Sequence, residues 1–494
     1  MLVKNALVLN RNGVFEKTDL RIERERMAAP KNCGPEPCAA RENPEEEIID
    51  AEGLLAFPGF VDIHIHGAAG CDFFDADPES IRRIAEFEAS QGVAAFCPTA
   101  MTCGEEKLEK ILDAAAAYLN APDAGEAETQ PGNTARGAGN SAPRAALCGV
   151  RLEGPFLNPA KAGAQDPGFI RPGSAQLVRE LQERCGGLIR VLDTAPEEPG
   201  NMEMIRELSG AYGERLRISM AHTAADFGTA LEAFQGGVRQ LTHTYNAMPG
   251  IHHREPGPVI AALEYNAAAD AKTCCTGSTG RDPDHAPDGI SAELIADGIH
   301  VHPAMVRFTF RAFGPERVIL ISDSMRAAGL PAGSYELGGQ AVTVLELPGE
   351  SLDKTKGEIK SGIKNEKTGI RPAENLREAD ARTETDSAGN KTDRPETNRT
   401  RKKAVLTDHP ETLAGSVASL YDCFRCAVLE MGIPAADAVR AASENPARAL
   451  GLFGDYGTLA PGAFANVILA DRELNLRGVI IRGRALRLSP PPQP

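Results

Sequence analysis

The sequence lacks the long apolar run that a membrane span or a secretory signal peptide requires. No window approaches about 18 uninterrupted apolar residues, and the apolar run in residues 1–10 is short and soon followed by charges. A tight disulfide framework is also missing, since the 11 cysteines are odd in number and scattered along the chain. These absences argue against a membrane protein or a small secreted domain, and we expect a cytoplasmic protein with free thiols.

An excess of basic residues is missing as well. The chain has 53 lysines and arginines against 69 acidic residues, so its formal net charge is −16. A general nucleic-acid binder, or a protein that binds anionic membranes, needs basic patches, and this balance argues against both classes. An anionic small substrate stays compatible with the composition, because a single arginine can act locally inside an acidic protein.

The 494 residues are enough for two or more domains. Short strand-like runs occur at both ends of the chain, at residues 6–9 and 20–22 and again at 465–470 and 478–483. Between the two ends, apolar strands alternate with helical patterns, which is typical of βα units around a parallel sheet. The sequence therefore predicts an α/β protein with a (β/α)8 TIM-type barrel and a small β-sandwich domain formed from both chain termini.

We place the two parts of the small β domain at residues 1–56 and 456–494, and the barrel at 57–455. Three segments with little apolar content look like insertions, at residues 27–47, 120–146 and 346–404. Such stretches cannot bury enough apolar surface to offset the entropy of ordering, so we expect mobile loops there. A lid or a partner-binding tail is the functional alternative for these segments.

Two histidines separated by one residue follow an apolar stretch in the run PGFVDIHIHG at residues 58–67. Side chains two apart on a strand point to the same face, so His64 and His66 would converge from one strand end. Such a pair suits a divalent metal held by imidazole nitrogens. The alternative is a pair of ordinary strand histidines, since the H-x-H pattern alone is a weak signal.

Four further apolar runs end in residues that can bind a metal or carry a proton: Glu153, His222, His243 and Asp323. In a barrel such strand ends meet at one face, where active sites are built. Each residue has a structural alternative, because the histidines could be hydrogen-bonded in the core, Glu153 could pair with Arg151, and Asp323 could cap a helix. Five strand ends with such residues are not expected by chance, since four of only 10 histidines fall there.

This combination of residues predicts a specific chemistry. Imidazoles and carboxylates around a divalent ion leave a position for water, and the ion lowers the pKa of that water from about 15.7 to about 7. Asp323 would act as general base by accepting the proton of the metal-activated water, and then as general acid toward the leaving group. The sequence therefore predicts metal-assisted hydrolysis of an amide-like bond.

Several motifs together resemble the N-acetylglucosamine-6-phosphate deacetylase family of the amidohydrolase superfamily. They are PGFVDIHIHG (58–67), RLEGPFLNPAKAGA (151–164), AHTAAD (221–226), LTHTYNAMPGIHHREPG (241–257), ADGIHVHP (296–303), LISDSMRAAGL (320–330), LAGS (413–416), NPARALGL (445–452) and GTLAPGAFANVILAD (457–471). The resemblance covers essentially the whole chain apart from the insertions. It implies hydrolysis of the acetamide of N-acetylglucosamine 6-phosphate to glucosamine 6-phosphate and acetate, in amino-sugar catabolism or cell-wall recycling.

The resemblance also implies roles for individual residues. Glu153, His222 and His243 match the principal metal ligands, His64 and His66 match an additional pair, and Asp323 matches the catalytic acid and base. The positions that match substrate contacts are Ala164, Asn246, Ala247, Arg254, Asp297, Gly298, Ile299, His300, Leu413, Ala414, Gly415 and Ser416. The implied cofactor is a divalent metal (Zn, Fe, Mn or Co) with one or two ions per subunit, and the implied assembly is a homodimer or homotetramer.

At two of these positions the side-chain chemistry itself also suits a sugar phosphate. Arg254 offers a rigid fork of donors suited to phosphate oxygens, although a surface salt bridge with Glu255 is its alternative. Asn246 supplies both a donor and an acceptor for sugar hydroxyls or phosphate. The nearest rival among enzymes is another amidohydrolase, such as a cyclic amidase or a deaminase. A non-catalytic barrel and a sensor of sugar phosphates are the rivals from other classes.

Overall fold

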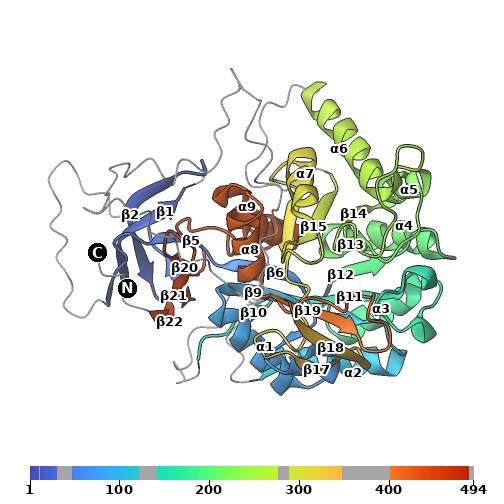
Figure 1. The fold of residues 1–494 in the computed structure, drawn as a ribbon, viewed down its shortest axis with the longest axis horizontal. Helices are drawn as coiled ribbons and strands as arrows, with labels where there is room; N and C mark the ends of the chain where they lie inside the picture. Colours follow the sequence, from blue (N-terminus) through green and yellow to red (C-terminus); the bar gives the residue numbers. More distant parts are fainter. Residues whose placement is uncertain (11, 30–46, 122–141, 276–288, 348–400, 489–494) are drawn as a thin grey trace, which may run out of the picture.

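The structure is a computed structural model of the whole chain. It describes residues 1–10, 12–29, 47–121, 142–275, 289–347 and 401–488. Within these ranges, no helix is both long and apolar enough to cross a membrane. Figure 1 shows a barrel surrounded by helices and, beside it, a smaller sheet that contains both the first and the last described strands, β1 and β22.

The barrel sheet follows the order of the chain. Its eight parallel main strands are β6 (Phe60–Ile65), β9 (Val93–Met101), β11 (Val150–Phe156), β12 (Ile189–Thr194), β13 (Arg217–Met220), β14 (Val238–Leu241), β15 (Ser291–Ile295) and β16 (Val318–Ile321). The short strand β10 (Ala146–Leu147) pairs with β9 just before β11 begins. These strands are buried along almost their whole length, as expected for a parallel sheet covered on its outer face. The predicted α/β barrel is confirmed.

Backbone hydrogen bonds join the last barrel strand to the first. The N–H of Asp323 donates to the carbonyl of His64 at 2.9 Å, and the N–H of His66 donates to the carbonyl of Ser324 at 2.8 Å. These residues lie at the carboxyl end of β6 and just beyond β16. The barrel is therefore closed at the end where the predicted site residues lie.

Ten helices in the described ranges pack mainly around the strands. They are α1 (Pro78–Ser90), α2 (Glu105–Asn120), α3 (Ala175–Arg184), α4 (Asn201–Tyr212), α5 (Phe227–Gly236), α6 (Gly257–Cys275), α7 (Pro303–Phe313), α8 (Leu420–Leu429), α9 (Ala435–Ala442) and α10 (Glu444–Ala449). Several begin at a side-chain cap, since Asp77, Ser174 and Asp226 accept backbone N–H groups at the starts of α1, α3 and α5.

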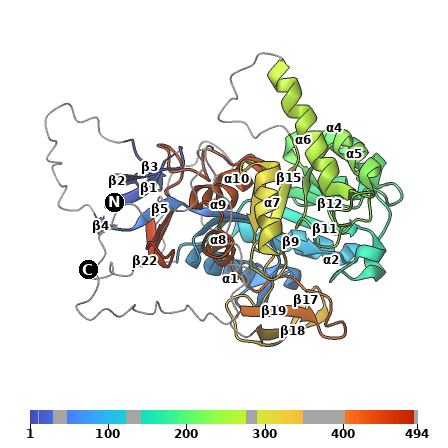
Figure 2. The ribbon, with the colours of Figure 1, turned by 45° about the horizontal axis from the view of Figure 1, so that its top comes forward.

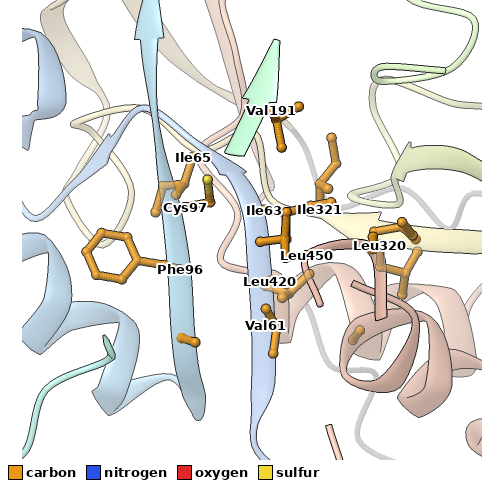
Figure 3. Packing of buried hydrophobic residues seen from close by; sticks show 14 of the residues in the cluster. Val61, Ile63, Ile65, Phe96, Cys97, Val191, Leu320, Ile321, Leu420 and Leu450 are labelled. Atoms are coloured by element: carbon orange, nitrogen blue, oxygen red, sulfur yellow. The ribbon is translucent and has the colours of Figure 1, made fainter. Parts of the chain in front are cut away.

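The largest hydrophobic cluster lies between the strands and these helices. Figure 3 shows Ile63 of β6 beside Ile321 of β16, and Val61 farther along β6 near Leu420 of α8; Leu450 belongs to the same cluster. Close packing of this kind leaves a strand little freedom to shift. It therefore fixes β6 immediately before its two histidines.

The two chain ends form one mixed sheet of eight strands. Its path is β22 (Arg484–Leu488), β21 (Leu476–Ile481), β20 (Val467–Ala470), β5 (Leu55–Pro58), β1 (Leu2–Leu9), β2 (Phe15–Glu23) and β3 (Arg26–Met27), with β4 (Ile48–Asp50) also paired to β1. Strand β5 is parallel to β1 and antiparallel to β20, so it joins the N-terminal strands to the C-terminal ones. Strands from both termini thus form one small β unit, as predicted, although the described strands belong to a single mixed sheet and not to the two sheets of the predicted sandwich.

A third, antiparallel sheet follows β16. It consists of β17 (Gly333–Leu337), β18 (Gln340–Leu347) and β19 (Arg401–Leu406), which Figure 2 shows together at the edge of the barrel. A two-stranded ribbon of β7 (Gly67–Ala68) and β8 (Cys71–Asp72) follows the first barrel strand. Each of these short sheets follows a barrel strand that leads into the predicted site: β7 and β8 come after β6, and β17 to β19 come after β16.

The prediction of a loop over residues 346–404 is wrong at both ends of that segment. Leu347, the last residue of β18, pairs with Arg401, the first residue of β19. Alternate residues of these strands, such as Val344 and Ala404, are buried in a hydrophobic cluster, which explains why they form a sheet despite the polar sequence between them. Residues 348–400 lie outside the described residues.

The other two predicted loops are also shorter than expected where the structure describes them. Met27 lies in β3, Asn120 ends α2, and Ala146 begins β10. The remaining parts of these segments at residues 30–46 and 122–141 lie outside the described residues, as do residues 276–288 after α6.

Candidate active site

The carboxyl ends of four barrel strands bring the five predicted metal ligands together. His64 and His66 lie at the end of β6, and Glu153 lies in β11. His222 lies two residues after the end of β13, and His243 lies two residues after the end of β14. They make two groups that share Glu153, one with the first histidine pair and one with the second. Within each group, one ligand atom from each residue lies within 4.8 Å of the others, and all the residues are buried.

The carboxylate of Glu153 lies between the two histidine pairs. Its Oε1 is 2.9 Å from Nε2 of His222 and 3.0 Å from Nε2 of His243. Its Oε2 is 3.2 Å from Nε2 of His66 and 3.5 Å from Nε2 of His64. Each oxygen of one carboxylate thus faces one pair of imidazoles.

Asp323 lies on the side of the first histidine pair. It follows β16 by two residues, and its Oδ1 is 3.2 Å from Nε2 of His66 and 3.4 Å from Nε2 of His64. Burial raises the pKa of the Asp323 carboxyl, but the charges that His64 and His66 carry when they are protonated outweigh burial and lower it to about 2. The carboxylate is therefore ionised at neutral pH and can accept a proton.

Several buried polar atoms in this cluster have no hydrogen-bond partner. They are both ring nitrogens of His64, Oε2 of Glu153, Nδ1 of His243 and Oδ1 of Asp323. A buried polar group left unpaired costs about 1–3 kcal/mol, so a group of them in one place indicates that they serve a ligand. Imidazole nitrogens with a carboxylate oxygen are the donor set of zinc and related ions, and these residues fit a divalent metal.

Backbone carbonyls orient two of the imidazoles. Nδ1 of His66 lies 3.2 Å from the carbonyl oxygen of Thr99, and Nδ1 of His222 lies 2.8 Å from that of Lys161. Because a carbonyl only accepts hydrogen bonds, each Nδ1 carries the hydrogen and each Nε2 lone pair faces the centre. The ring orientation that metal binding requires is thus built into the protein.

The backbone is strained at three of the site positions. His222, His243 and Asp323 have φ angles of 43°, 28° and 48°, in the left-handed region that residues with a side chain rarely adopt. Such a conformation costs about 1–3 kcal/mol, and its recurrence at three converging strand ends is typical of functional sites. The strain turns each side chain toward the common centre.

Three buried charged residues beneath the centre were missed in the sequence. Arg151 donates to both oxygens of Asp193 and to both oxygens of Glu293, and the three side chains are 0% exposed. The available signal was a charged residue inside a largely apolar strand, in β11 for Arg151, in β12 for Asp193 and in β15 for Glu293. The sequence suggested Arg151 only as a partner of Glu153, whereas its guanidinium binds Asp193 and Glu293 and also donates to the carbonyl of Ile63 and the hydroxyl of Thr242.

The predicted substrate segment around Asp297 forms a compact hydrogen-bonded unit. Asp297 accepts the backbone N–H groups of Ile299 at 2.9 Å and His300 at 3.0 Å, and its Oδ2 lies 2.7 Å from Nδ1 of His300. Gly298 turns the chain between them with a φ of 80°. Burial lowers the pKa of His300, but the charge of Asp297 outweighs burial and raises it. The Nδ1 hydrogen is thereby committed to Asp297, which leaves Nε2 for another partner.

The segment Leu413–Ser416 is brought to the same place by β19. The N–H of Ser416 donates to the carbonyl of Asp323 at 2.8 Å, and its Oγ donates to Oδ2 of Asp297 at 3.2 Å. Gly415 has a φ of 65°, and a Cβ at that position would lie 3.0 Å from the carbonyl oxygen of Asp323. Ala414 is buried in the cluster under the small sheet. Ser416 therefore links the Asp297 unit to the residue predicted to carry the proton.

The remaining predicted substrate residues lie on loops around the centre. Nδ2 of Asn246 donates to the carbonyl of His243 at 3.0 Å, and the carbonyl of Ala247 accepts the N–H of Thr223 at 3.1 Å. The carbonyl of Ala164 accepts from Gln340 of β18 at 2.6 Å. The contacts of Asn246 and Ala247 tie their loop to the segments that carry the predicted ligands His243 and His222, and the contact of Ala164 ties its loop to the small sheet.

Arg254 differs from the other predicted site residues because it is exposed. Its guanidinium hydrogen-bonds to Nε2 of His253 at 2.9 Å. Among the described residues it forms no ion pair with Glu255, the alternative partner that the sequence suggested. No recorded contact within the described ranges joins Arg254 to the buried centre.

Comparison with known proteins agrees with this arrangement. The model of the amidohydrolase family matches residues 55–486. An N-acetylglucosamine-6-phosphate deacetylase of Bacillus subtilis (strain 168) is 30% identical over 493 residues, which is 99% of this chain and 98% of that protein. An N-acetylgalactosamine-6-phosphate deacetylase of Escherichia coli O157:H7 is 28% identical over 437 residues, covering 88% of this chain and 89% of that one.

A solved structure gives the same result for the fold. A variant of N-acetyl-D-glucosamine-6-phosphate deacetylase from Mycobacterium smegmatis, in complex with N-acetyl-D-glucosamine-6-phosphate, superposes with a TM-score of 0.72 at 25% identity, covering 99% of both chains. The family model, the full-length relatives and this fold agree with the closed barrel and its cluster of imidazoles and carboxylates. The chain belongs to the amidohydrolase family.

Proposed function

We propose that this chain is a metal-dependent hydrolase that converts N-acetylglucosamine 6-phosphate to glucosamine 6-phosphate and acetate. The observation that carries the proposal is Glu153 between two histidine pairs, with the ionised carboxylate of Asp323 beside one of them. The full-length similarity to deacetylases of N-acetylated amino sugar phosphates supports the choice of substrate class.

The residues would divide between two metal positions. Glu153 with His222 and His243 would hold one ion, and Glu153 with His64 and His66 would hold the other where two are present. When bound, such an ion polarises a carbonyl and lowers the pKa of water from about 15.7 to about 7. Zinc, iron, manganese and cobalt all suit this donor set, and one or two ions per chain are consistent with the two groups.

Asp323 would carry the proton. Its Oδ1 is buried and unpaired, and the hydrogen bond from its own N–H to His64 fixes its backbone. An ionised carboxylate at this place can accept the proton of the attacking water and then deliver it to the amine that leaves. Asn or Ala could not perform this transfer.

The surrounding loops would bind the sugar. The contact of Nδ1 with Asp297 leaves Nε2 of His300 available. Nε2 could donate to the acetamide carbonyl when the ring is protonated, or accept from a sugar hydroxyl when the ring is neutral. The amide nitrogen of Asn246 is used by the carbonyl of His243, so its Oδ1 suits a hydroxyl better than a phosphate. Arg254 is the exposed fork of donors that would take the phosphate.

The experiment that tests the proposal is acetate release by purified protein of known metal content. N-Acetylglucosamine 6-phosphate is compared with its galactosamine epimer and with unphosphorylated N-acetylglucosamine. Rapid release from the glucosamine phosphate alone is the expected result. Faster release from the galactosamine phosphate would change the substrate, and no release at full metal occupancy would refute the proposed reaction.

A further inference from the structure

A fully buried arginine holds two carboxylates directly beneath the candidate metal centre. Nε and Nη2 of Arg151 lie 2.7 and 2.9 Å from the two oxygens of Asp193. Nη1 and Nη2 lie 2.6 and 3.1 Å from the two oxygens of Glu293. All three side chains are 0% exposed, so bulk solvent does not weaken these charge interactions. Both carboxylates are thus fixed in place by the same guanidinium.

The two carboxylates differ in what else they touch. Oε2 of Glu293 lies 3.5 Å from Nδ1 of His64, within ion-pair distance although the two atoms form no hydrogen bond, and it accepts the backbone N–H of His243 at 3.2 Å. Oε1 of Glu293 also accepts the side-chain amide of Gln240. Asp193 instead accepts the hydroxyl of Thr242 at 2.8 Å. No recorded hydrogen bond or ion pair in the described ranges joins Asp193 to any of the four imidazoles. Of the two carboxylates that Arg151 holds, Glu293 is therefore the one that contacts candidate ligand residues in the described ranges.

His64 is the only one of the four imidazoles whose Nδ1 faces a carboxylate in the described structure. The corresponding atoms of His66 and His222 face neutral backbone carbonyls, and Nδ1 of His243 has no partner. A carboxylate behind a ligand histidine fixes its ring and raises its basicity toward a metal. On its other side, Nε2 of His64 faces Glu153 and Asp323 at 3.5 and 3.4 Å.

We propose that Glu293 is a positioning residue for His64, and through it for the His64–His66 half of the metal centre. Held by Arg151, its carboxylate faces Nδ1 of His64 and keeps Nε2 turned toward the shared carboxylate of Glu153. A glutamine at this position would present an amide donor either to the N–H of His243 or to the guanidinium, so the arrangement could not be kept. The inference rests on the metal centre of the proposed function and not on the substrate.

The test compares two isosteric variants that each remove one carboxylate charge from Arg151. Glu293→Gln alters the partner of His64, whereas Asp193→Asn is the matched control that touches no ligand. His64→Asn serves as the reference for loss of this half of the centre. Each protein is loaded with zinc, dialysed against graded concentrations of a chelator without substrate, and analysed for metal per chain.

Glu293→Gln is expected to lower zinc affinity at this half of the centre by about 10- to 100-fold, the usual effect of losing such an outer contact. Its retained metal should match that of His64→Asn, while Asp193→Asn should retain as much as the wild type. If Glu293→Gln does not fold, Glu293→Asp is the second variant. Its shorter side chain keeps a negative charge beside Arg151 but moves the carboxylate away from His64, so it should lose as much zinc affinity as Glu293→Gln.

Wild-type metal retention in the Glu293 variants would overturn the proposal, and so would unchanged retention in His64→Asn. Equal loss in Asp193→Asn and Glu293→Gln would overturn it too, because the effect would then belong to the buried charge network as a whole. Metal content is measured without any sugar phosphate. Failure to hydrolyse the proposed substrate would therefore leave this result standing, and the two failures are distinguishable.

Discussion

The N–H of Asp323 donates to the carbonyl oxygen of His64 at 2.9 Å, so the proposed proton carrier and a proposed metal ligand are one backbone hydrogen bond apart. The same bond joins the last barrel strand to the first. The distance between these two functional groups is consequently set by the closure of the barrel and not by flexible side chains. Isosteric substitutions here should change the chemistry while leaving the geometry intact.

Replacing Asp323 by Asn should abolish proton transfer and leave binding intact. The amide keeps the size of the carboxylate but cannot accept the proton, so we expect acetate release to fall by about 10²- to 10⁴-fold. Metal content and the affinity for the sugar phosphate, measured by calorimetry, should stay close to the wild-type values. A variant that still turns over at the wild-type rate would remove Asp323 from the mechanism.

Replacing Arg254 by Ala should raise KM for the phosphorylated sugar. A charge-assisted hydrogen bond is worth about 1.5–3 kcal/mol, which corresponds to about a 10- to 100-fold increase. Steady-state acetate release measures it, and the unphosphorylated sugar should be insensitive to the change. Arg311 of α7 is also exposed, and Arg311→Ala is the matched control with no expected effect. Equal KM values in Arg254→Ala and the wild type would end the role of Arg254 as phosphate anchor.

Replacing Arg151 by Met should destabilise the protein strongly. The change leaves the buried carboxylates of Asp193 and Glu293 without their cation, and breaking a buried pair in this way costs about 3–5 kcal/mol. Arg184 also contacts two carboxylates, those of Glu109 and Asp113, but its side chain is 42% exposed. Arg184→Met should therefore cost only about 0–1 kcal/mol.

Denaturant unfolding of both variants measures this difference. The prediction fails if Arg151→Met loses no more unfolding free energy than Arg184→Met. The buried network would then contribute no more to stability than an exposed ion pair.

Replacing Glu88 by Gln should stabilise the protein increasingly as pH rises. Glu88 of α1 is fully buried, neither carboxylate oxygen has a hydrogen-bond partner, and burial together with the charge of Asp62 raises its pKa well above the usual value. The folded chain thus holds this proton more tightly than the unfolded chain. The wild type therefore loses stability as pH rises from the unfolded pKa of about 4.3 toward the folded one.

Thermal unfolding at about pH 5 and about pH 8 measures the effect, because Gln cannot ionise and escapes this loss. The advantage of Glu88→Gln over the wild type should be larger at the higher pH. Glu86 lies on the same helix but contacts Arg82 and Arg144, so Glu86→Gln should show no such widening. An advantage for Glu88→Gln that is the same at both pH values would contradict the prediction.

The barrel and its converging strand ends were predictable because five of its strands, β6, β11, β13, β14 and β16, are short apolar runs that lead to a histidine or a carboxylate. His222, His243 and Asp323 are visible in this way, and the structure brings them together. Their roles, and the domain boundaries at residues 57 and 455, remain predictions. Glu293 was not found, because a parallel strand buried on both faces has no alternating pattern to show which residues point inward.

The end of β18 and the start of β19 were not predicted from the sequence, for a different reason. Arg401, Lys402 and Lys403 begin β19, and three basic residues in a row are typical of a solvated loop. They form a strand because β18 pairs with them and because the following residues are buried beneath the small sheet. Long-range pairing of this kind cannot be read from local composition.

The position of β5 between β1 and β20 also has a consequence for the time during which the chain is made. A ribosome that adds about 5–20 residues per second needs roughly 20–80 s for the roughly 400 residues between β5 and β20. Throughout that interval one edge of β5 has no partner from its own chain, and an unpaired strand edge is a template for pairing with other chains. The period of greatest aggregation risk for this protein is therefore its own synthesis, before the last strands emerge.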